Sequence, residues 1–425
     1  MGRQWVQTKH GSDSFCRVVD YATRCSKFVM LNALVLGIVV LAGALLIWPP
    51  LARAPLWRAT ITPLASIIGS GFLVLGPILD VSYGGYAPLV MLGLCAVAYL
   101  FGSAVRFNIA QIDTRASRSV LVNQLETAAS AVLAFAFFIS VAYYLNLFGA
   151  FGVSLTDLDD SFHAKLLTTA VFVMILVVGW TRGFSALERM EQVSVGLKLA
   201  IIAGLLFGLA VHFGEAAQAD ALQFNPAQVT GWASVTLMAG LIVTVQGFET
   251  SRYLGATYDA PLRIRSMRLA QIVSTAIYAV YILLLTYAFK ADPLSLNETA
   301  IIDLMQVVTP ILPVLLVVAA LSAQFSAAIA DTSGSGGLVA EISKGKIPEK
   351  SAYALLVGSG VLLTWTADIF EIISYASRAF AAYYAIQSTI AALSAVKSGS
   401  PWKSALFFAM AGVGAGIALF STPVE

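Results

Sequence analysis

Charged residues are scarce in this sequence. Asp, Glu, Lys and Arg account for 11% of its 425 residues, whereas an average soluble domain contains about 25%. Hydrophobic residues account for 59%, which excludes an ordinary water-soluble globular fold. Because about 20 apolar residues cross a bilayer as a helix, a chain with many such runs is expected to be an all-α polytopic membrane protein.

Cysteine and histidine are also scarce, which excludes several kinds of site. The three cysteines and three histidines have no spacing typical of a disulfide framework or a metal centre. The chain lacks a His-Glu-x-x-His pattern, and residues 333–336 miss a Gly-x-Ser-Gly nucleophile motif by one residue. We therefore expect no metal, no cofactor, no enzymatic activity and no nucleic-acid partner.

Apolar runs separated by short loops predict about 11–12 transmembrane helices. We call the first run the extra helix and number the others from helix 1 to helix 11. The predicted division is a leader with the extra helix at 1–58, a core at 59–396, and a final helix with the C-terminus at 397–425. The runs lie near residues 29–49, 60–79, 84–104, 124–149, 165–181, 191–213, 231–252, 269–289, 304–330, 352–366, 370–395 and 403–421.

The loops alternate in charge. Lys and Arg gather after helices 2, 4, 6, 8 and 10, and acidic residues dominate the other loops. By the positive-inside rule the basic loops are cytoplasmic, so helix 1 begins inside and runs outward. The basic leader before the extra helix conflicts with this orientation. It fits a cleaved signal peptide, a hairpin in one leaflet, or a span whose N-terminus lies outside, and the consistent loops favour the last.

Glycine interrupts two predicted spans. Helix 1 contains Gly69-Ser70-Gly71, and helix 6 contains the stretch 244–249 with Gln246 and Gly247. A broken helix is tolerated in a membrane only where its freed backbone groups find partners, and in transporters those partners are often a substrate and its coupling ion. The alternative is close packing of helices through small residues.

The two breaks suit different ends of a small zwitterion. Backbone N–H groups at residues 69–71 would lie at the N-terminus of a half-helix, where the dipole favours a carboxylate. Unwound carbonyls near Gln246 would accept hydrogen bonds from an ammonium group. Glu249 either serves a gate or is an ordinary paired residue near the cytoplasmic end of helix 6.

The order of several motifs resembles the amino acid–polyamine–organocation (APC) superfamily of amino acid permeases. The resemblance covers roughly residues 60–400 and implies two inverted five-helix repeats, about 59–213 and 230–396, with broken helices 1 and 6. The sequence departs from the family pattern at Gln246, where an aromatic residue is usual, and it lacks an Arg at the end of helix 8. The motifs are Gly69–Gly71, the helix 4–5 junction at 179–186 with Gln192 and 197–199, the stretches 247–249 and 259–261, and the stretches 321–326 and 342–348.

The resemblance also implies a substrate site and a coupling site. Substrate would lie between the two breaks. Lys198 would take the place that a sodium ion occupies in other members, and it would couple transport to protons together with Ser322 and Ser326. The alternative for Lys198 is snorkelling to the headgroups. The substrate-lining residues would be Ile67, Ile68, Gly69, Ser70, Gly71, Thr244, Gln246, Gly247 and Phe248, with Tyr143 from helix 3.

Arg378 is the remaining candidate, because an arginine inside a span is costly. It lies within helix 10 and is expected to bind a substrate carboxylate or, as favoured here, to pair with an acid such as Glu126 or Glu371. With Glu249 it forms the candidate gate or charge pair.

The sequence therefore predicts a secondary active transporter that works by alternating access in the cell membrane, of the bacterial inner-membrane type. Its partners would be an amino acid-like solute, a proton and the lipid bilayer. Alternatives are a sodium-driven or other ion-driven carrier on the same scaffold, and a transport-inactive sensor or scaffold. Ser322 is followed by Ala323 instead of a second hydroxyl residue, which disfavours sodium.

Overall fold

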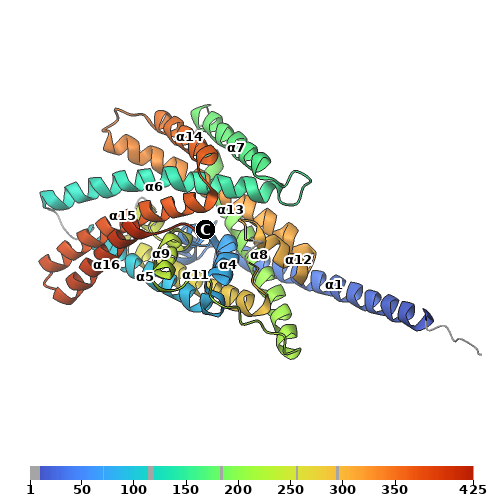
Figure 1. Ribbon diagram of the computed structural model, residues 1–425. Coiled ribbons are helices and arrows are strands. Elements are labelled where there is room, and N and C mark those ends of the chain that lie inside the picture. Colours follow the sequence, from blue (N-terminus) through green and yellow to red (C-terminus); the bar gives the residue numbers. More distant parts are fainter. Residues whose placement is uncertain are drawn as a thin grey trace, which may run out of the picture.

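The computed structural model in Figure 1 is a bundle of helices. It describes residues 10–69, 71–112, 119–181, 185–254, 257–292 and 296–424, and every regular element within these ranges is a helix. Ser70 and residues 182–184 of the helix 4–5 junction lie outside the described residues. The all-α polytopic fold class is confirmed, since nine described helical segments are long and apolar enough to cross a membrane.

Each predicted span corresponds to a helix or a pair of shorter helices. The extra helix is α1 (His10–Ile47), followed by the short α2 (Pro49–Ala52). The first half of the core contains α3 (Pro55–Ile67), α4 (Gly71–Tyr83), the 3-10 turn η1 (Gly84–Tyr86), α5 (Ala87–Ile112), α6 (Val120–Val153), α7 (Ser161–Thr181) and α8 (Ser185–Gln218).

The second half repeats this order and ends with one further helix. It contains α9 (Gly231–Gly240), the 3-10 turn η2 (Ile242–Val245), α10 (Thr250–Tyr253), α11 (Ala260–Ala288), α12 (Ala300–Val308), α13 (Ile311–Ile342), α14 (Glu349–Thr366), α15 (Ile369–Lys397) and α16 (Pro401–Phe420).

The predicted bounds of helix 8 are wrong. The predicted span 304–330 begins inside α12, whereas α13 begins at Ile311 and continues to Ile342. The two helices separate because Thr309 is extended (φ −166°, ψ 141°), the conformation that a following proline favours. The glycine-rich end of α13 is helical, and its small residues let neighbouring side chains approach closely. A Cβ atom at Gly336 would lie 2.3 Å from the Tyr353 ring.

The packing of the core follows a five-helix repeat. Helix 3 packs against helix 10 (α6 and α15), and helix 8 packs against helix 5 (α13 and α8). Each helix of the first repeat corresponds to the helix five numbers later in the second. Helices 2 and 10 (α5 and α15) pack together, and so do their counterparts, helices 7 and 5 (α11 and α8). Helices 3 and 4 (α6 and α7) also pack together, as do helices 8 and 9 (α13 and α14). Each crossing reverses the direction of the chain, so a second repeat that begins after five crossings is inverted relative to the first.

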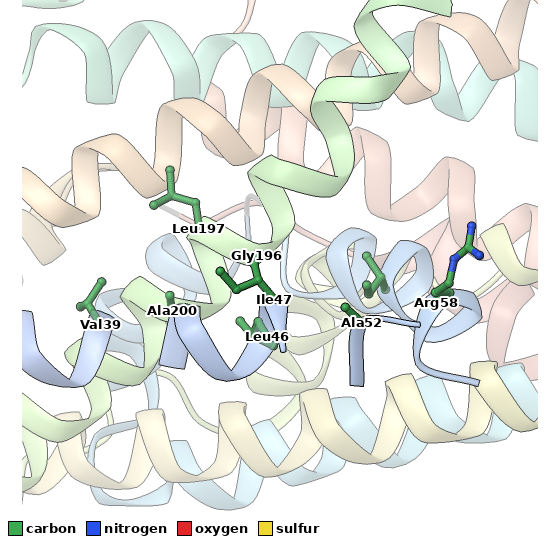
Figure 2. A pocket seen from close by; sticks show the side chains of 10 residues that line it. Val39, Leu46, Ile47, Ala52, Arg58, Gly196, Leu197 and Ala200 are labelled. Carbon is green, nitrogen blue, oxygen red and sulfur yellow. The ribbon is translucent and has the colours of Figure 1, made fainter. Parts of the chain in front are cut away.

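The extra helix α1 runs antiparallel to α8 (Figures 1 and 2). Lys27 pairs with Glu215 at 2.9 Å, and farther along α1 Gly43 lies opposite Ala200. Residues 196–215 of α8 rise about 28 Å at 1.5 Å per residue, close to the thickness of a hydrocarbon core. A hairpin confined to one leaflet is therefore wrong. The antiparallel arrangement agrees with an outside N-terminus when helix 5 runs outward.

Candidate functional site

Helix 1 is broken at its glycines, as the sequence predicted. The helix α3 ends at Ile67, Ile68 has non-helical dihedral angles (φ −83°, ψ 41°), and α4 begins at Gly71. A Cβ atom at Gly69 would lie 2.8 Å from the backbone oxygen of Ser66, so this turn requires glycine.

Helix 6 is also broken at its predicted place. After η2 the backbone is extended at Gln246 (φ −83°, ψ 176°), and Gly247 has φ +113°. This positive φ is readily adopted only by glycine. Helical structure resumes at Thr250, so the break covers residues 246–249.

The two breaks pack directly against each other. A Cβ atom at Gly71 would lie 2.6 Å from the Cβ of Thr244, and one at Gly247 would lie 2.6 Å from the backbone carbon of Ser66. In this conformation the glycines therefore serve close backbone packing, which was the alternative to direct contact with substrate.

Polar side chains from neighbouring helices satisfy several of the freed backbone groups. The Tyr278 hydroxyl on α11 lies 3.0 Å from the oxygen of Ile67 and 2.6 Å from that of Thr244, so its single proton is shared between both breaks. Ser377 on α15 donates to the Gly240 oxygen at 2.6 Å and accepts from the Val243 N–H at 3.1 Å. Sequence reasoning missed both residues. Their only signal is a polar group within an apolar span.

Glu249 lies inside the protein and closes the helix 6 break. Its side chain is buried, and its Oε2 accepts from the Gly247 N–H at 3.0 Å and from the Tyr384 hydroxyl at 2.8 Å. The Tyr384 ring lies between two others, with centroids 5.1 Å from Phe248 and 5.0 Å from Phe101. The Glu249 carboxylate and the three stacked rings thus hold the chain in place where it leaves the helix 6 break.

Helix 3 contacts the break through Tyr144. Gln246 donates from Nε2 to the Tyr144 hydroxyl at 3.2 Å, while its buried Oε1 has no partner among the described residues. The predicted Tyr143 is fully buried beside Tyr144, with the two ring centroids 5.3 Å apart. One turn earlier on α6, Ser140 donates to Asp331 of α13. Sequence reasoning missed Asp331, although an acid in an apolar span is a functional signal.

Lys198 lies inside the bundle and does not snorkel. It is 5% exposed, and its Nζ donates to the Ala65 oxygen of α3 at 2.7 Å. One turn earlier on α8, the Ser194 hydroxyl lies 2.6 Å from that of Ser322 on α13. Ser326 lies one turn beyond Ser322 and is half-buried. Lys198 therefore has the predicted contact with a helix 1 carbonyl, and α8 contacts α13 through a serine pair.

Two small cavities adjoin the breaks. The first is lined by Gly69, Lys198 and Gln324, and the second by Ile67, Val245 and other residues of α5 and α11. Each has a volume of about 10 Å³, which is the space of roughly one water molecule. The buried Gln324 Oε1 has no partner among the described residues, so the first cavity is partly polar.

The predicted pairing of Arg378 is wrong. Its Nε donates to the Ser421 hydroxyl at 3.2 Å, and an Nη donates to the Ser421 carbonyl. Glu126 instead pairs with Arg252, and Glu371 caps the start of α15. Arg378 lies one residue beyond Ser377, but its long side chain reaches the end of α16, where free carbonyls favour a cation.

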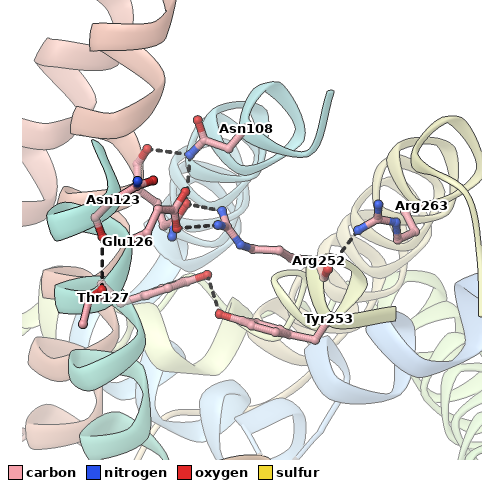
Figure 3. A network of polar contacts seen from close by, with 9 residues as sticks. Asn108, Asn123, Glu126, Thr127, Arg252, Tyr253 and Arg263 are labelled. Atoms are coloured by element: carbon pink, nitrogen blue, oxygen red, sulfur yellow. Dashed lines mark hydrogen bonds and ion pairs between the residues drawn. The ribbon is translucent and has the colours of Figure 1, made fainter. Parts of the chain in front are cut away.

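A network of polar side chains joins four helices at the end of the bundle that carries the basic loops (Figure 3). We call Asn108, Glu126, Arg252 and Gln387 the Arg252 network. Arg252 pairs with Glu126 at 2.5 Å and donates to Gln387, which also accepts from Asn108 at 2.8 Å. The Arg252 and Glu126 side chains are only 10% and 17% exposed, so the network closes this end of helices 2, 3, 6 and 10.

Comparison with known proteins agrees with this architecture. Residues 49–421 match a family described as an APC superfamily transporter family, so the match begins after the extra helix. A protein of Aquifex aeolicus (strain VF5), named only as uncharacterized, is 39% identical over 388 residues, which cover 89% of this chain and 93% of that relative. Two broken helices in corresponding places and a family match over most of the chain lead to one conclusion. The chain belongs to the APC superfamily transporters and is a multi-pass membrane transporter.

Proposed function

We propose that this transporter moves amino acids or related small organic solutes by alternating access, driven by a proton gradient across the cell membrane. The observation that carries the proposal is the buried Lys198 amine, which donates to the Ala65 carbonyl next to the helix 1 break. This contact joins helix 5 to a broken helix by a group that can gain and lose a proton.

Substrate would bind where helices 1 and 6 now touch. The adjoining cavities hold about one water molecule each, so the backbones at Gly71 and Thr244 must separate before a solute can enter. Separation would expose N–H groups at the start of α4, which suit a carboxylate. The unpartnered Gln246 Oε1 would accept a hydrogen bond from an amine. An amino acid carries both groups.

The proton would act through the contact between Lys198 and Ala65. The charged amine is a stronger donor than the neutral one, so protonation favours the linked state of α8 and α3. Loss of the proton would weaken the link and let the broken helix move. Ser322 already bonds Ser194, and Ala323 follows it, so this place offers few oxygen ligands for a sodium-driven alternative.

The Arg252 network would be the barrier at the basic-loop end. Its members come from both repeats, and Arg252 itself follows the helix 6 break by a few residues. Opening toward this side requires the pair of Arg252 and Glu126 to separate, because both side chains lie between the helices. Glu249 would transmit movement of the break to Tyr384 on helix 10.

The test is uptake into proteoliposomes of a panel of amino acids and related solutes, with and without a pH gradient. We expect accumulation of at least one amino acid when the gradient is present, and no change when sodium is replaced by choline. Accumulation that requires sodium would favour the ion-driven alternative. No uptake of any solute by folded protein would contradict the proposal.

A further inference from the structure

An open apolar groove separates the extra helix from the core (Figure 2). It has a volume of about 520 Å³ and lies between α1, the α2–α3 segment and α8. Its lining includes Val39, Leu46, Ile61 and Leu197, and Arg58 is the charged residue among the described residues that line it. The groove is thus apolar along its length and cationic at one end.

Gly196 leaves space in the groove. A Cβ atom at Gly196 would meet nothing within 4 Å, so the protein itself leaves this place unfilled. Farther along α8 the packing is tight, since a Cβ atom at Gly204 would lie 2.6 Å from Val39. The end of α1 is exposed, with Ile47 at 75%. The helices α1 and α8 are therefore in close contact near Val39 and Gly204, and the space between them opens toward α2.

The positive charge of the groove lies at the end of the bundle that carries the basic loops. Arg58 is exposed in the first turn of α3, the helix that begins at the basic-loop side of the bundle. By the positive-inside rule this side is cytoplasmic, and that leaflet carries the anionic lipids. Basic pockets between helices on this side bind anionic headgroups.

We propose that the groove binds one anionic phospholipid of the cytoplasmic leaflet, with its phosphate at Arg58 and an acyl chain along Gly196. A guanidinium suits a phosphate because it donates two parallel hydrogen bonds. The matched family region begins at residue 49, so α1, one wall of the groove, lies outside that region. The lipid fills the space between α1 and the core that matches the family.

The bound lipid contacts both helices that Lys198 joins. Gly196 is two residues from Lys198 on α8, and Ile61 is one turn from Ala65 on α3. Lipid binding itself is independent of the proposed transport activity, and it is measured without any substrate.

The experiment is native mass spectrometry of the full chain, purified in detergent and mixed with equal amounts of phosphatidylglycerol and phosphatidylcholine. We expect the wild-type chain to retain one phosphatidylglycerol in preference to phosphatidylcholine. Arg58→Gln should reduce this retention by roughly tenfold or more, since the loss of even one of the two charge-assisted hydrogen bonds corresponds to about tenfold. Gly196→Leu should reduce it similarly by filling the groove, and Arg53→Gln, an exposed arginine nearby that does not line the groove, should leave it unchanged.

Three results would overturn the proposal. The first is equal retention of the two lipids by the wild-type chain. The second is unchanged retention in both Arg58→Gln and Gly196→Leu, where Arg58→Gln changes an exposed residue and tests the site even if the leucine variant misfolds. The third is a dimer that Gly196→Leu converts to a monomer, which would make a second copy of this chain the occupant.

Discussion

Replacement of Lys198 by Gln should uncouple transport from the proton gradient. The Lys198 amine donates to the Ala65 oxygen at 2.7 Å in a buried site. A hydrogen bond from a charged group contributes about 1.5–3 kcal/mol and one from a neutral group about 0.5–1.5 kcal/mol. The difference of about 1–1.5 kcal/mol means that protonation biases α8 and α3 toward the linked state by roughly 5- to 13-fold. A glutamine amide can donate a hydrogen bond, but it carries no proton to release. Its link to α3 would be weaker and would not respond to pH.

The assay is accumulation in proteoliposomes under a gradient of about one pH unit. One proton per solute supplies about 1.36 kcal/mol, which sustains up to about tenfold accumulation in the wild-type chain. Lys198→Gln should equilibrate its solute without accumulating it, while exchange in the absence of a gradient persists. Lys290→Gln is the matched control, because Lys290 is exposed just beyond the end of α11. Tenfold accumulation by Lys198→Gln would refute the coupling role.

Three further perturbations test the architecture of the site. Gly71→Ala should lower the midpoint of thermal unfolding in detergent, because overpacking costs about 1–3 kcal/mol. Gly337→Ala should not lower it, because a Cβ atom there meets nothing within 4 Å. Equal midpoints of the two variants would contradict close packing of the breaks. Tyr278→Phe should lower the midpoint more than Tyr281→Phe, since the first loses a bond shared by two break carbonyls and the second a 3.4 Å contact; a larger effect of the second would be inconsistent with this role. Glu126→Gln should speed amide hydrogen exchange in α10. The loss of stability should be below the roughly 3–5 kcal/mol for breaking a fully buried pair, because both side chains are partly exposed. Unchanged exchange would show that the Arg252 network is not a barrier.

The positions of the two breaks could be predicted because they follow from local chemistry. Glycine in a long apolar run weakens a helix wherever it occurs, and a membrane tolerates the break only where the backbone finds partners. The breaks can therefore be located at Gly69 and Gly247 without knowing which groups their backbone atoms bond to. The bounds of helix 8 were less predictable, because the apolar run continues through Thr309 and only the following proline separates α12 from α13.

The partners of the buried polar residues could not be predicted in the same way. Arg378 was expected to meet an acid, yet it bonds Ser421, while Glu126 bonds Arg252. Nothing in the local sequence distinguishes these choices, because a long arginine side chain reaches acceptors several ångströms from its helix. Tyr278 shows the same limit, since its hydroxyl serves two breaks that are far away in the chain.

The sequence by itself determined the membrane class, the helical spans and the places where two of them break, because apolar length and glycine act locally. The tertiary structure alone decided that Gly71 meets Thr244, that the Lys198 amine reaches Ala65, and that the extra helix runs antiparallel to α8. These contacts join residues distant in the chain. In a low-dielectric interior each buried polar group must bond to whatever partner the packing brings within about 3 Å, and only the packing identifies that partner.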